Sequence, residues 1–322
     1  MPLVRTMPLP RRFIPFPSTV KSRNISPLST PSPSGSRCLP IMSAIFRPLA
    51  SAAYTVFLFN QHDIISTLGP AIVVGCVLSG IPDLGSLLSA IIWHELHLLP
   101  FQIKNQIYGV EEDRVSKPSR PLPQGRLTVQ SAQRLYLGLT ALAILSSASL
   151  GLLMPGILHI ATSLAYNEGG LAKFWALKSF MGSIGYMCYC WGMTVIFDNH
   201  RPLSRTSLIA VVLSGLIFTT TGHAQDFRDR DGDRLMGRKT LAIVLPQRFG
   251  RWSLTALILA WTVGLTYLWD PPIVVSVSFI ALAAYTTANF VRDHSQEADR
   301  VSYWWYNIWL VFAHVLPLFR RL

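Results

Sequence analysis

The sequence has few charged side chains, and acidic ones are the scarcer kind. Of its 322 residues only 14% are charged, with 16 Asp and Glu against 28 Lys and Arg, whereas a soluble domain normally carries about 25%. The hydrophobic share is 50%, and apolar runs of about 18 residues recur along the chain. These proportions exclude an ordinary soluble domain and predict an all-α integral membrane protein that crosses the lipid bilayer several times.

Cysteine is also scarce. The chain has four cysteines, without the CxxC or His-rich spacing of a zinc site. Cys188 and Cys190 lie within an apolar segment, where free cysteine behaves as a small apolar residue. The sequence therefore supports neither a disulfide framework nor a zinc centre.

The net charge of +12 does not require a nucleic-acid partner, because membrane proteins commonly have basic loops on one side. No protein partner is predicted either. Residues 1–44 contain no Asp or Glu and are rich in Pro, Ser and Arg. This composition predicts a disordered basic arm, followed by a transmembrane catalytic domain over residues 45–322. An organelle transit peptide is an alternative interpretation of the arm, although its prolines oppose an amphipathic helix.

Hydropathy predicts about nine membrane spans. The first covers residues 41–59, and the second combines a bent or re-entrant piece at 66–79 with a helix at 84–103. The others are predicted at residues 135–153, 156–166, 174–197, 207–223, 252–269, 273–291 and 303–319.

The basic residues predict the orientation of these spans. With nine spans, one side of the membrane holds every Lys and Arg except Arg201, Arg205, Arg320 and Arg321. The positive-inside rule assigns that side to the cytosol. The endoplasmic reticulum membrane is the predicted location, and the mitochondrial inner membrane, with the same side facing the matrix, is the alternative.

The clearest chemical motif is QDFRDRDGDRLMGRK at residues 225–239, which closes an apolar segment. On a helix, Asp226, Asp229 and Asp233 share one face, while Asp231 points elsewhere. Carboxylates on one face repel one another unless a cation lies between them, and Mg²⁺ prefers oxygen ligands that include substrate phosphate oxygens. The remaining phosphate charge suits the basic residues that are interleaved and follow, namely Arg228, Arg230, Arg234, Arg238 and Lys239.

A second polar stretch has nearly the same design: NQIYGVEEDRVSKPSRPLPQGR at residues 105–126. Asn105 and Asp113 share a helix face and offer oxygen ligands, and Lys117 and Arg120 follow. The prolines predict a structured loop that can close over a site. A charged loop between spans is ordinarily just solvated, but two such motifs on one predicted side favour a shared diphosphate site.

These motifs resemble the two signature motifs of the UbiA superfamily of intramembrane prenyltransferases. SKPSRPLPQGR at 116–126 is similar to that superfamily's NKPxRPLPSGR, and GRKTLAIVLP at 237–246 is similar to its GxxTLPxxLG. Tyr166 followed by Lys178 is a looser match. The resemblance implies nine transmembrane helices around a central cavity, in which two Mg²⁺ ions hold a prenyl diphosphate beneath the motif loops.

On this basis each motif residue receives a predicted role. The predicted Mg²⁺ ligands are Asn105, Asp113, Asp226, Asp229 and Asp233. All of them except Asp226 are also predicted to be catalytic. The predicted substrate-binding residues are Lys117, Arg120, Arg228 and Lys239 at the diphosphate, with Tyr166 and Lys178 at the cavity mouth.

The first motif departs from the typical prenyltransferase pattern. Gln106 and Gly109 stand where aspartates are usual, so one carboxylate ligand is missing. This form resembles a fungal branch that includes membrane-bound terpene cyclases. The resemblance implies a cyclase of secondary metabolism that ionises farnesyl or geranylgeranyl diphosphate. The alternative is a prenyltransferase with an aromatic or other lipophilic acceptor, and a transporter or lipid-binding scaffold represents a different class.

A cyclase needs a dry cavity in which aromatic faces stabilise a carbocation. The aromatic candidates in the spans are Trp93, Phe174, Trp175, Phe180, Tyr186, Tyr189, Trp191, Phe218, Trp261, Trp304, Trp305 and Trp309. Polar residues within spans are costly in lipid, so they are expected to face the interior. These residues are His94, Glu95, His97 and His223.

Overall fold

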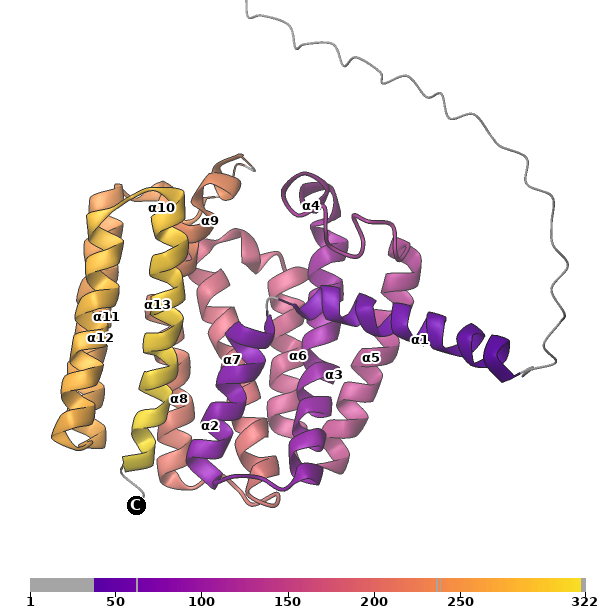
Figure 1. Ribbon diagram of the computed structural model, residues 1–322, viewed down its shortest axis with the longest axis horizontal. Helices are drawn as coiled ribbons and strands as arrows, with labels where there is room; N and C mark the ends of the chain where they lie inside the picture. The colour runs from indigo at the N-terminus through magenta and orange to yellow at the C-terminus, as the bar shows by residue number, and fades with distance from the viewer. Residues whose placement is uncertain (1–37, 62, 236, 238, 320–322) are drawn as a thin grey trace, which may run out of the picture. The chain divides into compact units, whose positions relative to one another are not determined.

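The computed structural model describes residues 38–61, 63–235, 237 and 239–319. The predicted arm lies mostly outside the described residues, although the first helix already begins at Cys38. Pro48–Leu322 form one compact unit, and the contacts below are those of this unit. Within the described ranges every regular element is a helix, which confirms the all-α prediction (Figure 1).

The helices follow the predicted apolar segments, with short polar helices between some of them. In chain order the elements are α1 (Cys38–Asn60), the π-helical η1 (Ile64–Leu68), α2 (Gly69–Ser79), α3 (Leu84–Tyr108), α4 (Val110–Ser116), α5 (Val129–Ser149), α6 (Leu153–Asn167), the 3₁₀ turn η2 (Leu171–Lys173), α7 (Trp175–Phe197), α8 (Arg205–Thr221), α9 (Ala224–Leu235), α10 (Leu241–Val244), α11 (Gln247–Trp269), α12 (Ile273–Arg292), α13 (Gln296–Val315) and the 3₁₀ turn η3 (Leu316–Phe319).

Four helices are long and apolar enough to cross a membrane by themselves, namely α3, α7, α11 and α12. Two more spans result if each bent pair counts as one: Arg47–Asn60 with Ile64–Ser79, bent by 62°, and Arg205–Thr221 with Ala224–Arg234, bent by 41°. The prediction of nine spans is therefore approximate for the described residues. One reason is that α6 has only 15 residues, too few to cross a bilayer unaided.

A sharp break separates α2 from α3. Gly80 has a φ of 96°, a conformation that glycine adopts without steric cost. Asp83 then caps α3, because its Oδ1 accepts hydrogen bonds from the backbone N–H groups of Gly85 (2.7 Å) and Ser86 (3.0 Å). The two pieces of the predicted second span are thus separate helices.

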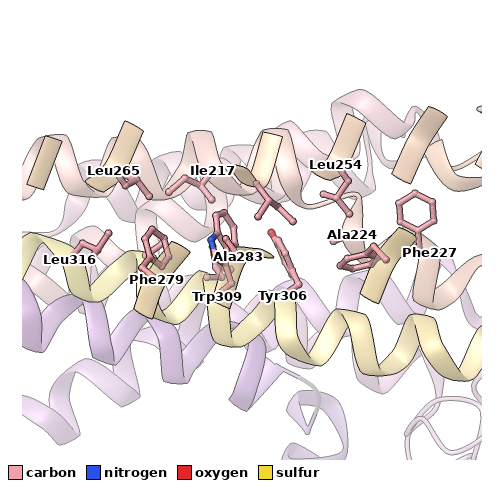
Figure 2. Packing of buried hydrophobic residues seen from close by; sticks show 14 of the residues in the cluster. Ile217, Ala224, Phe227, Leu254, Leu265, Phe279, Ala283, Tyr306, Trp309 and Leu316 are labelled. Carbon is pink, nitrogen blue, oxygen red and sulfur yellow. The ribbon is translucent and has the colours of Figure 1, made fainter. Parts of the chain in front are cut away.

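Two groups of helices make the core. In the first, α3 packs against α5 and α7, and α7 also contacts α2, α6 and α8. In the second, α12 packs between α11 and α13, and α13 returns to α2 and α9. Figure 2 shows the hydrophobic cluster of the second group, where Phe279 stacks on Trp309. Phe227 of α9 belongs to this cluster, so the core itself orients the second acidic motif.

The two acidic motifs are carried by α4 and α9, which lie at the same end of the long helices (Figure 1). Each follows an apolar helix directly. Gly109 separates α3 from α4, and the chain bends by 41° between α8 and α9. The fold therefore presents both motifs at one end, as the predicted orientation requires.

Close packing of α7 on α3 makes Gly192 a sensitive position. A Cβ added at Gly192 would lie 2.2 Å and 2.4 Å from ring carbons of Trp93, and Trp93 is fixed because its Nε1 donates a hydrogen bond to Ser147 Oγ at 2.9 Å. We expect Gly192→Ala to lower the free energy of unfolding by about 1–3 kcal/mol. Thermal unfolding of the detergent-purified protein measures this change.

Gly264→Ala is the matched control. Gly264 lies within α11, and a Cβ there meets nothing within 4 Å. Alanine should therefore raise the stability of this helix by about 0.5–1 kcal/mol. Equal effects of the two substitutions would contradict the close contact between α7 and Trp93.

Candidate functional site

The aspartates predicted to share a face of α9 lie as the helical spacing requires. Asp226 and Asp233 are buried, and Asp229 is half-buried. The side chain of Asp231 is 54% exposed and points elsewhere. The backbone N–H of Leu241 donates to Asp226 Oδ2 at 3.3 Å, so the segment after the motif folds back onto it.

Basic side chains from two helices hold these carboxylates. Arg228 donates from Nε to Asp229 Oδ1 at 2.8 Å and from Nη2 to Asp229 Oδ2 at 2.9 Å, and its guanidinium stacks over the ring of Tyr303 at 4.3 Å. Lys178, in the first turn of α7, has its Nζ 3.8 Å from Asp226 Oδ1. The second motif therefore combines carboxylates and cations within one patch.

Burial and charge act differently on the two carboxylates of this polar helix, which lies beyond the apolar part of α8. Burial raises the pKa of Asp226 to about 6, and the charge of Lys178 opposes this effect. Burial also raises the pKa of Asp229, but the hydrogen bonds and charge of Arg228, together with the charge of Lys117, leave it below its ordinary value. Asp229 is thus an anion with cationic partners already in place.

The first motif is built at the end of α3. The helical hydrogen bonds continue through Gly109: its N–H donates to Asn105 O at 3.0 Å, and the N–H of Asp113 donates to Gly109 O at 2.8 Å. Asp113 is 2% exposed, and Arg120 Nη1 donates to its Oδ2 at 2.7 Å. Residues 117–128 contain no helix, in agreement with the prediction from the prolines.

Lys117 connects the two motifs. Its side chain is exposed, yet its charge acts on Asp229 of the second motif and on Asp63, at the break between α1 and η1. The charge of Lys117, in the loop after α4, therefore acts on a carboxylate of α9. The two motifs lie at the same end of the long helices although they are more than 100 positions apart in the sequence (Figure 1).

Asp63 is a site residue that sequence reasoning missed. Its Oδ2 accepts a hydrogen bond from Gln102 Nε2 at 2.5 Å, and it interacts electrostatically with Arg120, Lys117 and Glu95. The available signal was a lone acidic residue between two apolar segments. Asp63 therefore supplies a carboxylate close to Gln102, which lies one turn of α3 before Asn105.

Other predicted residues have different surroundings. The ring of Tyr166 packs edge-on against Phe101 at 5.3 Å, and Lys239 is exposed after α9. Arg230 differs from the expectation of a phosphate ligand: it donates to Gln247 and to the backbone O of His294, both at 2.9 Å. It lies on the opposite face of α9 and fixes that helix to its neighbours.

The aromatic candidates divide into three groups. Tyr186, Tyr189, Trp93 and Trp309 are buried. The half-buried ones are Trp191, Phe218, Trp261 and Trp305. In contrast, the side chains of Phe174, Trp175, Phe180 and Trp304 are 43–61% exposed, so they do not line an interior cavity in this conformation. Aromatic residues near the ends of membrane helices commonly face the interface instead.

The donor set of the site suits magnesium. Within the described ranges, no group of three His, Cys, Asp or Glu side chains is close enough to hold a metal ion. Mg²⁺ does not require such a group, because it typically takes one or two carboxylates together with waters and substrate phosphate oxygens. The buried carboxylates of Asp113, Asp226 and Asp233, with the half-buried Asp229, are oxygen ligands of this kind.

Comparison with known proteins gives three findings. The family model described as the UbiA prenyltransferase family matches residues 67–311. The chain is 41% identical over 268 residues to the fumagillin beta-trans-bergamotene synthase of Aspergillus fumigatus, covering 83% of this chain and 93% of that protein. It is 28% identical over 280 residues to a diterpene cyclase of Hericium erinaceus, covering 82% and 87%.

Among solved structures, a UbiA homolog from Archaeoglobus fulgidus bound to GPP and Mg²⁺ has the same fold. The TM-score is 0.57 at 14% sequence identity, and the match covers 84% of this chain and 97% of that chain. The two chains therefore share one fold over most of their length.

Proposed function

This chain belongs to the UbiA prenyltransferase family, and from this premise we propose that it is a magnesium-dependent intramembrane terpene cyclase. Its substrate is a linear prenyl diphosphate, farnesyl or geranylgeranyl diphosphate, and its product is a cyclic terpene hydrocarbon. The relatives named as a bergamotene synthase and a diterpene cyclase support the cyclase over a transferase.

The observation that carries this proposal is that both motifs, at the same end of the helices (Figure 1), pair an aspartate with an arginine. Arg120 pairs with Asp113 in the first motif, and Arg228 pairs with Asp229 in the second. A diphosphate carries several negative charges, and the arginines of the two motifs can bind its oxygens. Asn105, Asp113, Asp226, Asp229 and Asp233 are the proposed Mg²⁺ ligands.

We propose that two arginines of the site change partners when the substrate binds. Arg120 and Arg228 pair with Asp113 and Asp229. On binding, both guanidinium groups turn to phosphate oxygens, and the released carboxylates become available as metal ligands. Bound Mg²⁺ supplies neutralisation of the leaving diphosphate. Lys117, Arg120 and Arg228, with Lys178 and Lys239, stabilise the developing charge as the C–O bond breaks.

A prenyltransferase is the second candidate, because the family model that the chain matches is that of the UbiA prenyltransferases. The pocket between α3, α5 and α6 has a volume of only about 10 Å³, which is room for about one water molecule. It is lined by His97, His159, Lys104 and Tyr136 among others. A lipophilic acceptor would therefore need a larger opening than this pocket provides.

The protein is an integral membrane protein, and its sidedness is part of the proposal. The basic residues flank the motif end of the helices, which we assign to the cytosolic face of the endoplasmic reticulum. A water-soluble prenyl diphosphate head group then enters from the cytosol, while its chain enters the membrane-spanning part.

Incubation of expressed membranes with farnesyl or geranylgeranyl diphosphate, without an acceptor, tests the function. We expect a cyclic hydrocarbon from one of the two substrates with Mg²⁺, and none after chelation with EDTA. Membranes lacking the chain serve as the control. Intact diphosphate in the presence of Mg²⁺ would contradict the cyclase, and consumption only after addition of an aromatic acceptor would establish the transferase.

A further inference from the structure

One carboxylate lies deep in the membrane-spanning part of α3, away from the proposed diphosphate site. Glu95 precedes Asn105 by ten residues, which corresponds to about 15 Å along an α-helix. An ionisable side chain at such a depth is costly in lipid and usually marks a functional position. Its hydrogen-bond partners, Asn60 and His94, do not belong to that site.

Glu95 lies on the face of α3 that leads to this site. Gln102 and Gln106 follow Glu95 by seven and eleven residues, so all three side chains lie on one face of the helix. Gln102 is hydrogen bonded to Asp63, and Asp63 interacts with Glu95 as well as with Lys117 and Arg120. The same stripe of α3 therefore runs from the diphosphate-binding loop to Glu95.

The carboxylate of Glu95 is held by two neighbours and remains accessible. Asn60 Nδ2 donates to its Oε2, and His94 Nδ1 lies 3.4 Å from its Oε1. His94 is itself fixed, because its ring packs on Tyr189 at 4.3 Å. The Glu95 side chain is nevertheless 27% exposed. This arrangement fixes a carboxylate in position while about a quarter of its side chain stays exposed.

We infer that Glu95 is the counter-charge and proton acceptor for the carbocation in this enzyme, and that Asn60 and His94 position it. The inference rests on the proposed cyclase function. When diphosphate leaves with the C–O electron pair, an allylic cation remains near the motifs. Attack by a distal C=C bond forms a C–C bond and moves the positive charge along the chain, toward the depth of Glu95.

In the final step the carbocation loses a proton to Glu95. Its carboxylate accepts a proton from a carbon next to the cation, and the electron pair of that C–H bond becomes the new C=C bond. The products are a neutral hydrocarbon, diphosphate and one proton, which leaves Glu95 for water when the products depart. A negative charge at this depth also stabilises the cation before the proton moves.

Glu95→Gln, which keeps the shape and removes the charge, tests this role. Diphosphate release and hydrocarbon composition are measured in the same membranes. We expect ionisation to continue, while the main hydrocarbon formed per diphosphate released falls on the order of 100-fold, with alcohols and other olefins in its place. Glu95→Asp keeps a carboxylate and should recover part of the main product, which a merely structural role would not predict.

Glu297→Gln is the matched control, since Glu297 is exposed at the start of α13 and should leave the product pattern unchanged. An unchanged hydrocarbon and yield in Glu95→Gln would overturn the inference while leaving the cyclase intact. Failure of the unaltered protein to consume any prenyl diphosphate would instead overturn the proposed function. The two failures are therefore distinguishable.

Discussion

Asp229→Asn should abolish most product formation without unfolding the protein. The substitution keeps the shape of the side chain but removes the charge that Arg228 and Lys117 neutralise, together with a proposed Mg²⁺ ligand. Loss of one electrostatic group of this kind typically costs on the order of 10²–10³ in kcat. Product analysis over a range of Mg²⁺ concentrations measures the effect, and excess Mg²⁺ should restore part of the activity.

Asp231→Asn provides the control on the same helix. Asp231 lies two residues away, but its side chain is mostly exposed and pairs with neighbouring Arg230 at 3.4 Å. This variant should retain activity within about twofold, because exposed ion pairs contribute little. Equal losses in both variants would show that the general charge of α9 matters rather than one face of it. Full activity in Asp229→Asn would contradict the proposed ligand role.

The face of α9 was predictable because it depends only on helical period. Asp226, Asp229 and Asp233 share a face whenever the segment is helical, and the exposure of Asp231 follows from the same spacing. Likewise, the prolines after Lys117 exclude a helix whatever surrounds them. Local rules of this kind need no knowledge of the remaining chain.

Contacts between distant segments were not predictable in this way. Asp63 lies where the chain bends by 62° between α1 and the helical segment Ile64–Ser79. A hydropathy pattern predicts the apolar segments but not the angle between them. The sequence gives Arg230 and Arg228 the same predicted role, yet Arg230 lies on the other face of α9 against α11. The nine-span layout was approximate for a related reason, since short or bent helices cross only with help from their neighbours.

Asp299→Asn is expected to cause the largest loss of stability. Arg251 donates to Asp299 Oδ1 at 2.6 Å and to Oδ2 at 2.9 Å, and both side chains are at most 1% exposed. Removing the carboxylate charge leaves the Arg251 guanidinium buried without compensation. Breaking a buried pair in this way costs about 3–5 kcal/mol. Thermal unfolding in detergent, at fixed detergent concentration, measures the change.

Glu111→Gln is the comparison at an exposed pair. Glu111 and Arg114 lie 2.7 Å apart, but their side chains are 77% and 58% exposed, so the loss should be no more than about 0.5 kcal/mol. Similar destabilisation in both variants would contradict the burial of the Arg251–Asp299 pair.

The Arg251–Asp299 pair affects function as well as stability. Arg230 of α9 lies 3.5 Å from Asp299 Oδ2, and Arg251 stacks over Phe227 of the same helix at 4.6 Å. Asp299 therefore fixes the face of α9 opposite to the aspartates. Asp299→Asn should weaken Mg²⁺ binding as well as stability, because α9 then loses the anchor that points Asp226, Asp229 and Asp233 toward the first motif. A destabilised variant with unchanged Mg²⁺ dependence would show that the core cluster alone orients α9.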